Sequence, residues 1–220
     1  HTEGYGSYLI PAVLMVIIFQ TLLMVIGMIS GDERNTGALS IYTGREKSFF
    51  SVSRIILGKT FVYCSLYFIF SLFLLGLMPV LFSLPDIGHK YEITMLMIPY
   101  LLASCFLGLA ASVFYTDSES PLLMIAFFSV GLIFLSGVSY PLELMPWYWK
   151  IAHFIIPAAP GTLAFVKINS MGASMADIRP EYITLWLQCI VYFIFAVMAY
   201  RYNIKKCIQK KARKETGPFM

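Results

Sequence analysis

The residues of this sequence that come nearest to a catalytic motif are Gly58, Lys59 and Thr60. They resemble the end of a phosphate-binding loop, in which backbone N–H groups and a lysine hold the phosphates of a nucleotide. That motif requires another glycine five residues before Gly58, where this chain has Ser53. A true loop also follows a buried strand, whereas Lys59 stands at the start of an apolar run. We therefore expect that this chain does not hydrolyse nucleotides.

Histidines and carboxylates are the remaining candidates for proton transfer or metal binding. His153 and Glu143 share one apolar loop, where they could relay protons or contact a substrate, or instead cap a helix or rest at a membrane interface. His89 has no second histidine or cysteine at ligand spacing, and the four cysteines show no paired spacing. No Ser, His and Asp set is arranged as in a hydrolase. The sequence thus predicts no catalytic residue, no disulfide and no metal site.

The elements that position these residues follow from the composition, which is 59% hydrophobic and only 13% charged. Soluble domains are about half apolar and about a quarter charged. Five runs lack Asp, Glu, Lys and Arg over roughly the 20 residues that a membrane-spanning helix needs. These runs are 8–30, 60–84, 93–115, 121–138 and 182–200. We predict an all-α, polytopic transmembrane helical bundle with five spans in a single domain over 1–220.

The distribution of positive charge predicts the orientation. Most of the 16 lysines and arginines lie around the connection 31–58 or in the tail 201–220. Because cytoplasmic connections carry an excess of Lys and Arg, we expect both segments inside, with His1 outside and Met220 cytoplasmic. The basic tail could be a nucleic-acid patch, but beside a last span we favour a topology anchor that touches anionic membrane lipids, and we expect no nucleic-acid partner.

The connection 31–58 has a pattern typical of an amphipathic helix at the membrane surface. Asp32 can cap a helix, and Arg34, Ala38, Ile41 and Tyr42 recur at spacings of three and four. Such a helix is either a connector that rests on lipid or a docking helix for a cytoplasmic partner, and the pattern alone does not choose between them.

The outside loop 139–181 is apolar and interrupted by prolines. Its segment after Pro146 holds Trp147 and Trp149, aromatic residues that favour the membrane interface, and it is too short to span. Irregular backbone at that depth requires partners from protein or from a water-filled cavity. We predict two re-entrant half-helices that cover or line a path. Small residues such as Gly27 and Gly108 indicate close helix packing, within one chain rather than between subunits.

After the first span, several residues resemble a stretch found in the membrane subunits of ABC-2 type transporters. The stretch comprises Glu33, Arg34, Gly37, Ala38, Leu39 and Thr43, followed by Arg54, Leu57, Gly58 and Lys59. In that family it forms a coupling helix that rests on a separate ATPase. The resemblance therefore implies that the first six of these residues couple the chain to an ATPase.

A second stretch resembles the outer signature of the same family. It comprises Ser136, Gly137, Tyr140, Pro141, Glu143, Met145, Pro146 and Pro157. Family members fold this region as re-entrant outer helices. We accordingly expect an outer re-entrant gate formed by Pro141, Glu143, Met145, Pro146, Trp147, Trp149, His153 and Pro157. Residues 169–173 resemble the branch associated with multidrug-type efflux, whose members carry an earlier span and a large outside domain, so we expect six spans in the full length.

The resemblance implies a non-enzymatic permease subunit of an exporter in the bacterial cytoplasmic (inner) membrane. Its substrate would be a drug-like compound, a lipid or another amphiphile. The expected partners are an ABC ATPase subunit, which would bind the ATP and Mg, and a second permease copy or a paralogue; this chain would hold no cofactor. The alternatives are a membrane-embedded lipid-modifying enzyme, which the near absence of ionisable residues within the runs disfavours, and a non-catalytic scaffold, which would not need the proline-broken loop.

Overall fold

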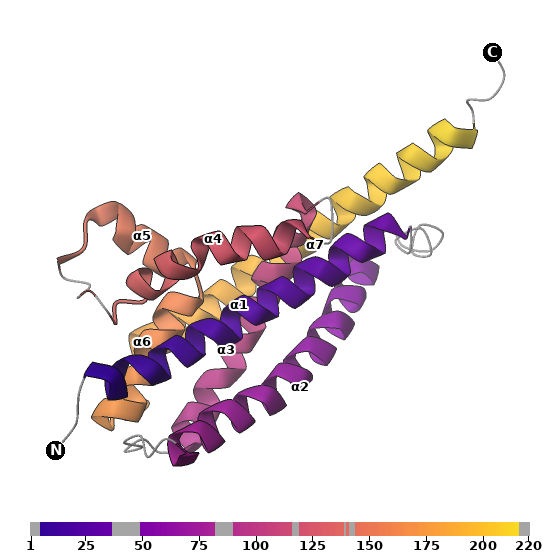
Figure 1. Cartoon of the computed structure of the whole chain (residues 1–220). Coiled ribbons are helices and arrows are strands. Elements are labelled where there is room, and N and C mark those ends of the chain that lie inside the picture. Colours follow the sequence, from indigo (N-terminus) through magenta and orange to yellow (C-terminus); the bar gives the residue numbers. More distant parts are fainter. Residues whose placement is uncertain are drawn as a thin grey trace.

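The computed structural model describes residues 5–36, 49–81, 90–115, 119–138, 140 and 144–215, and the regular elements within them are all helical (Figure 1). The α-helical bundle predicted from the sequence is therefore confirmed. The helices are α1 (Tyr5–Asn35), α2 (Phe49–Leu81), α3 (Lys90–Ala111), the short 3₁₀ helix η2 (Ser112–Phe114), α4 (Ser120–Leu135), α5 (Trp147–Ile155), α6 (Ala158–Met171) and α7 (Arg179–Glu215).

Four helices are long and apolar enough to cross a membrane, and their crossing segments are Leu9–Asn35, Phe49–Leu77, Lys90–Phe114 and Arg179–Ile204. The pair α5 and α6 raises the number to five if it counts as one broken span, because its two helices meet at 85°. Each of the four segments overlaps most of a run that the sequence marks as a span, namely 8–30, 60–84, 93–115 or 182–200. The chain is thus a multi-pass membrane protein.

Helix α4 occupies the fourth predicted span, 121–138, but it is only 16 residues long. At 1.5 Å per residue it measures about 24 Å, which is less than the roughly 30 Å hydrocarbon core. It ends at Leu135, and Gly137 adopts a positive φ of 80°, in the left-handed region that terminates helices. The glycine thus sets the length of α4.

The helices on either side of the connection 31–58 are longer than the apolar runs. Asp32 does not begin a new helix as its capping potential predicts, because α1 continues to Asn35 and the Asp32 carbonyl accepts from Thr36 N at 2.9 Å. Helix α2 already begins at Phe49. Within this connection, residues 37–48 lie outside the described residues, and the amphipathic helix predicted there stays a prediction.

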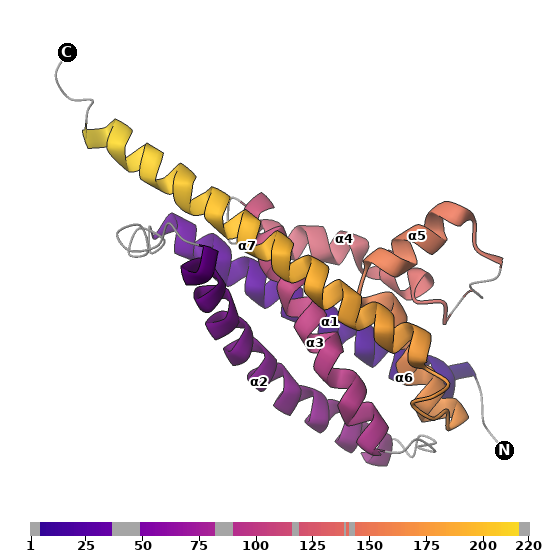
Figure 2. The same ribbon diagram turned by 180° about the vertical axis from the view of Figure 1, so that it is seen from behind.

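Helix α3 is the centre of the bundle and packs against α1, α2, α6 and α7 (Figures 1 and 2). Tyr100, in the middle of α3, is fully buried, and its hydroxyl donates to the Met15 carbonyl of α1 at 2.7 Å. Gly161 of α6 lies against the Tyr100 ring so closely that a Cβ there would be 2.2 Å from a ring carbon. Three helices therefore meet at one tyrosine.

Small residues also bring α1 close to its neighbours. A Cβ on Gly27 would lie 2.6 Å from Pro121 of α4, and a Cβ on Gly108 would lie 3.1 Å from Ile26. Both glycines thus serve helix packing within the chain. The outer surfaces of α2, α4 and α7 expose large apolar side chains such as Phe61 and Phe127, at 75% and 82%. These surfaces suit a lipid environment.

Candidate functional site

A charged cluster joins three helices at the end where α1 finishes and α2 begins. The Lys59 ammonium contacts both carboxylate oxygens of Glu33, with Oε1 at 2.5 Å, and donates to the Tyr200 hydroxyl at 3.2 Å. The side chains of Lys59 and Glu33 are only 16% and 22% exposed. Because removal of one partner would leave a largely buried charge uncompensated, this pair fixes the relative positions of α1, α2 and α7.

Arg34 connects the same end of α1 to η2, the short helix that follows α3. Its guanidinium donates to the backbone carbonyls of Ser112 at 2.6 Å, Val113 at 3.1 Å and Tyr115. The last carbonyls of a helix have no partner within it and carry partial negative charge, so a cation is stabilising there. Four helices are thereby tied together at this end.

Two of the six residues predicted to couple the chain to an ATPase, Glu33 and Arg34, lie in this cluster, and both bond to the chain's own helices. Gly37, Ala38, Leu39 and Thr43 lie outside the described residues. The pairing of Glu33 with Lys59 was not predicted, although the sequence carries a signal for it. Glu33 follows one apolar run and Lys59 precedes the next, and consecutive antiparallel spans place these two ends on the same membrane side.

The bent pair α5 and α6 is the most irregular part of the described chain. Pro146 is the residue directly before α5, and Pro157 is the residue directly before α6. Proline has no N–H, and the first N–H groups of a helix lack helical partners, so proline costs little there. The prolines thus mark where each short helix begins. The axes of α5 and α6 meet at 85°.

Side chains from α5 and α7 satisfy the carbonyl groups around this bend. Gln188 Nε2 donates to the Phe154 carbonyl at 2.7 Å, and the Tyr192 hydroxyl donates to the Ile155 carbonyl. The buried His153 ring donates from Nδ1 to the Leu135 carbonyl at the end of α4, at 2.8 Å. We call Gln188, Tyr192 and His153 the clamp residues. They supply the protein partners that broken backbone needs within a membrane.

The residues predicted to form an outer gate have different environments. Met145 is buried at 6% exposure, whereas Trp147 and Trp149 are exposed at 73% and 39%, as expected for side chains at a membrane interface. His153 bonds to a helix end, which is the capping role left open by the sequence. Pro141 and Glu143 lie outside the described residues. Whether this region acts as a gate stays a prediction.

The far ends of α3, α6 and α7 carry a second polar group. Lys167 pairs with Glu181 at 2.6 Å, and Glu92 Oε1 accepts from the Met175 backbone N–H at 3.3 Å. In the turn before α7, Ser174 donates to the Asp177 carboxylate through its hydroxyl and its backbone N–H, and both bonds lower the pKa of that carboxyl. These contacts fix the connection between α6 and α7.

Sequence reasoning missed Gln188 and Tyr192. Gln188 was detectable, because it is the one carboxamide in the run 182–200, and a polar side chain inside a span usually has a specific partner. Tyr192 carries no comparable signal, since tyrosine is common in apolar helices. Its partner, the Ile155 carbonyl, becomes free only because α5 ends at that residue.

We predict that Gln188→Leu destabilises the bent pair. Leucine has a similar volume but leaves the Phe154 carbonyl without its donor, and an unsatisfied buried carbonyl costs about 1–3 kcal/mol. Thermal unfolding in detergent should show the loss, and amide hydrogen exchange should rise in α5. Thr184→Val is the control, because the Thr184 hydroxyl donates to the Pro180 carbonyl of its own helix and not to another helix among the described residues. Equal losses in both variants would contradict a specific role for Gln188.

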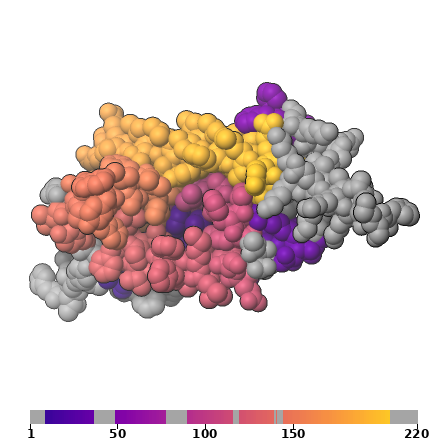
Figure 3. Space-filling view, turned by 90° about the horizontal axis from the view of Figure 1, so that it is seen from above, coloured from indigo at the N-terminus to yellow at the C-terminus, as the bar shows by residue number. Residues whose placement is uncertain are grey.

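Figure 3 shows α4, α5 and α7 on one face of the molecule, with the middle of α1 at the bottom of a hollow between α4 and α7. Among the described residues, no group of three or more His, Cys, Asp or Glu side chains is arranged to hold a metal ion. The features found in the described part of the chain are a charged cluster at one end, a second polar group at the other, the clamped bend and broad apolar surfaces.

The family model described as ABC-2 family transporter protein matches residues 1–198, which is most of the chain. No curated protein matches the chain.

Proposed function

Since the chain belongs to the ABC-2 family of transporter proteins, we propose that it is a permease subunit that couples ATP hydrolysis by a separate ATPase to export of an amphiphilic substrate. Members of this family are membrane components of transporters and have no ATPase site of their own. ATP and Mg would accordingly be bound by the partner. A second copy of the chain, or a paralogue, would complete the path across the membrane.

The family match over residues 1–198 carries this proposal, and the charged cluster supports it. The connection that would receive the ATPase follows Glu33 and Arg34 directly. Glu33 pairs with Lys59 of α2, which also donates to Tyr200 of α7, and Arg34 donates to carbonyls of η2. A displacement of the connection would therefore act on four helices together rather than on one. Rigid elements joined in this way are a physical route by which movement at one end reaches the other.

The proposed orientation places the charged cluster at the cytoplasmic face of the bacterial inner membrane and the bent pair α5 and α6 at the outer face. Lys and Arg in the connection 31–58 and in the tail 201–220 support it through the positive-inside rule. In this orientation the helix break near Pro157 lies where a substrate would leave. The clamp residues would then hold the closed form of an outer gate.

Capture of the full-length protein by its C-terminal end, followed by mass spectrometry, tests the partnership. We expect a stoichiometric protein with a phosphate-binding loop and an ABC signature. A variant in which a Gly/Ser sequence replaces residues 37–43 should lose that protein, while its thermal unfolding stays unchanged because α1 ends before this segment. Repeated absence of an ATPase from the unmodified protein, with nucleotide present, would contradict the proposal.

A further inference from the structure

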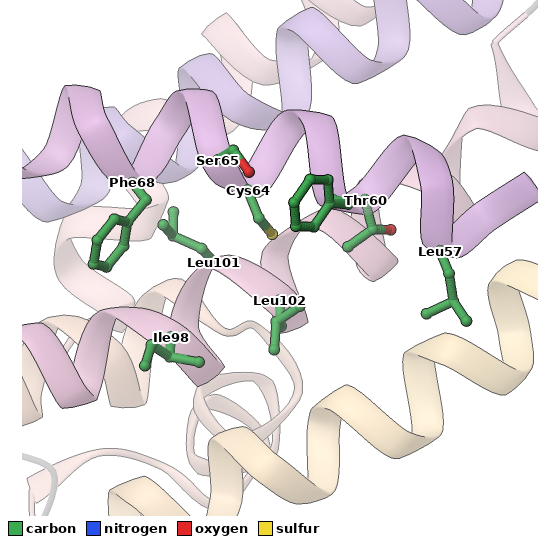
Figure 4. A pocket seen from close by; sticks show the side chains of 9 residues that line it. Leu57, Thr60, Cys64, Ser65, Phe68, Ile98, Leu101 and Leu102 are labelled. Atoms are coloured by element: carbon green, nitrogen blue, oxygen red, sulfur yellow. The ribbon is translucent and has the colours of Figure 1, made fainter. Parts of the chain in front are cut away.

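Helices α2 and α3 line a groove of about 650 Å³ (Figure 4). Helix α2 lies on the side of the bundle away from α4 and α5 (Figure 1). Its walls are mainly apolar and are formed by Leu57, Phe61 and Phe68 of α2 and by Ile98, Leu101 and Leu102 of α3. The groove lies between two helices that cross the membrane, so its surroundings are lipid rather than water. It is therefore a lipid-facing groove of defined shape.

The length of this groove matches one leaflet of a bilayer. Leu57 and Phe68 are eleven residues apart, which is about 16 Å along a helix, and half of the hydrocarbon core is about 15 Å. Beyond Phe68 the same helix pair leaves only about 70 Å³, between Phe68 and Lys90. The groove thus ends near the middle of the membrane.

Its other end is polar. Arg54 is exposed, and it lies on the same face of α2 as Leu57, Phe61 and Phe68, because these positions recur at spacings of three, four and seven. Thr60 also lines the groove, and its hydroxyl is buried with no hydrogen-bond partner among the described residues. A ligand that suits these features has a long apolar part and an anionic, hydrogen-bonding head.

We propose that this groove binds a glycerophospholipid from the leaflet on the Arg54 side, with one acyl chain along α2 from Leu57 to Phe68 and the phosphate at Arg54. The guanidinium is suited to phosphate, because it presents several N–H donors in a planar fork. This proposal requires only that α2 and α3 cross the membrane. If the groove binds no phospholipid, the proposed partnership with an ATPase is not affected.

The length of the groove favours an acyl chain over a helix of a second copy. A spanning helix has to follow the whole hydrocarbon core of about 30 Å, and it would find this groove along only about half of its length. An acyl chain of one leaflet occupies half of the core, which is the length of the groove between Leu57 and Phe68.

A photoreactive phospholipid, with a diazirine near the end of one acyl chain, tests this assignment in bilayers that contain the full-length protein. Mass spectrometry of the peptides should place the label in 57–68 and 98–102 at least about fivefold above the exposed face of α4, which includes Phe127. Ser65→Trp should fill the groove and remove the excess, whereas Val62→Trp, on an exposed part of α2 outside the groove, should not.

The head-group contact is tested separately. Arg54→Gln should lower the amount of phospholipid retained through purification about fivefold, the effect of one basic residue at a membrane surface. Lys90→Gln, at the opposite end of the helix pair, should leave the retained amount unchanged. Two results would overturn the proposal. Equal labelling of all apolar faces by the photoreactive phospholipid would mean that the groove holds bulk lipid only. Protein cross-links from residues 57–68 to a second copy would assign the groove to a subunit interface.

Discussion

Replacing Gly161 with alanine is expected to destabilise the bundle by about 3 kcal/mol or more. The new methyl carbon would lie 2.2 and 2.4 Å from two carbons of the Tyr100 ring. That ring cannot move aside easily, because Tyr100 is fully buried and its hydroxyl is bonded to the Met15 carbonyl. Overpacking of a filled core typically costs 1–3 kcal/mol. The cost is expected to be high here because the methyl group would disrupt contacts among α1, α3 and α6. Thermal unfolding of the purified protein would measure the loss.

The matched control for this prediction is Gly131→Ala in α4. Nothing lies within 4 Å of a Cβ at Gly131, so alanine should be neutral there or should stabilise the helix by up to about 1 kcal/mol. Adding Tyr100→Leu to Gly161→Ala should recover part of the lost stability, because the smaller side chain makes room for the methyl group. If the double variant were as unstable as the sum of the two single variants, the proposed clash would be wrong.

The spans themselves could be predicted from the sequence because each requires only local information. A run without charges, such as 93–115, must be a buried helix in lipid, since a spanning segment has to satisfy its backbone internally. The prolines and interfacial tryptophans of the loop 139–181 predicted short helices that cannot continue, although the sequence did not single out the bend at Pro157. The structure places α5 and α6 on either side of that residue.

The contacts between helices could not be predicted in this way. Gln188 and its acceptor at Phe154 are 34 residues apart, and Arg34 and its acceptor at Ser112 are 78 apart. Neither pair has a sequence spacing that implies contact, because both depend on which helices become neighbours. Helix α2 begins at Phe49, well before the predicted span 60–84, because the absence of charge marks where an apolar run begins and not where its helix begins.

The second large effect is expected from Glu33 and Lys59, whose ion pair is mostly buried. Either Glu33→Lys or Lys59→Glu should cost about 3–5 kcal/mol, because each leaves two like charges in contact where opposite charges now lie. The double reversal, Glu33→Lys with Lys59→Glu, should restore most of the stability. Thermal unfolding of all four proteins gives the coupling energy between the two positions.

The same double reversal separates two roles of Glu33. Replacing Glu33 and Arg34 together should uncouple ATP hydrolysis from export, but it would also remove bonds to α2 and to η2, so a loss of export would have two causes. The double reversal keeps an ion pair between α1 and α2 and changes only the charge that Glu33 offers to a partner. If Glu33 contacts the ATPase, the reversed protein should be stable yet retain less ATPase on capture. If it retains as much ATPase as the unmodified protein, Glu33 acts only within the bundle, and the ATPase contact must be sought in residues 37–43.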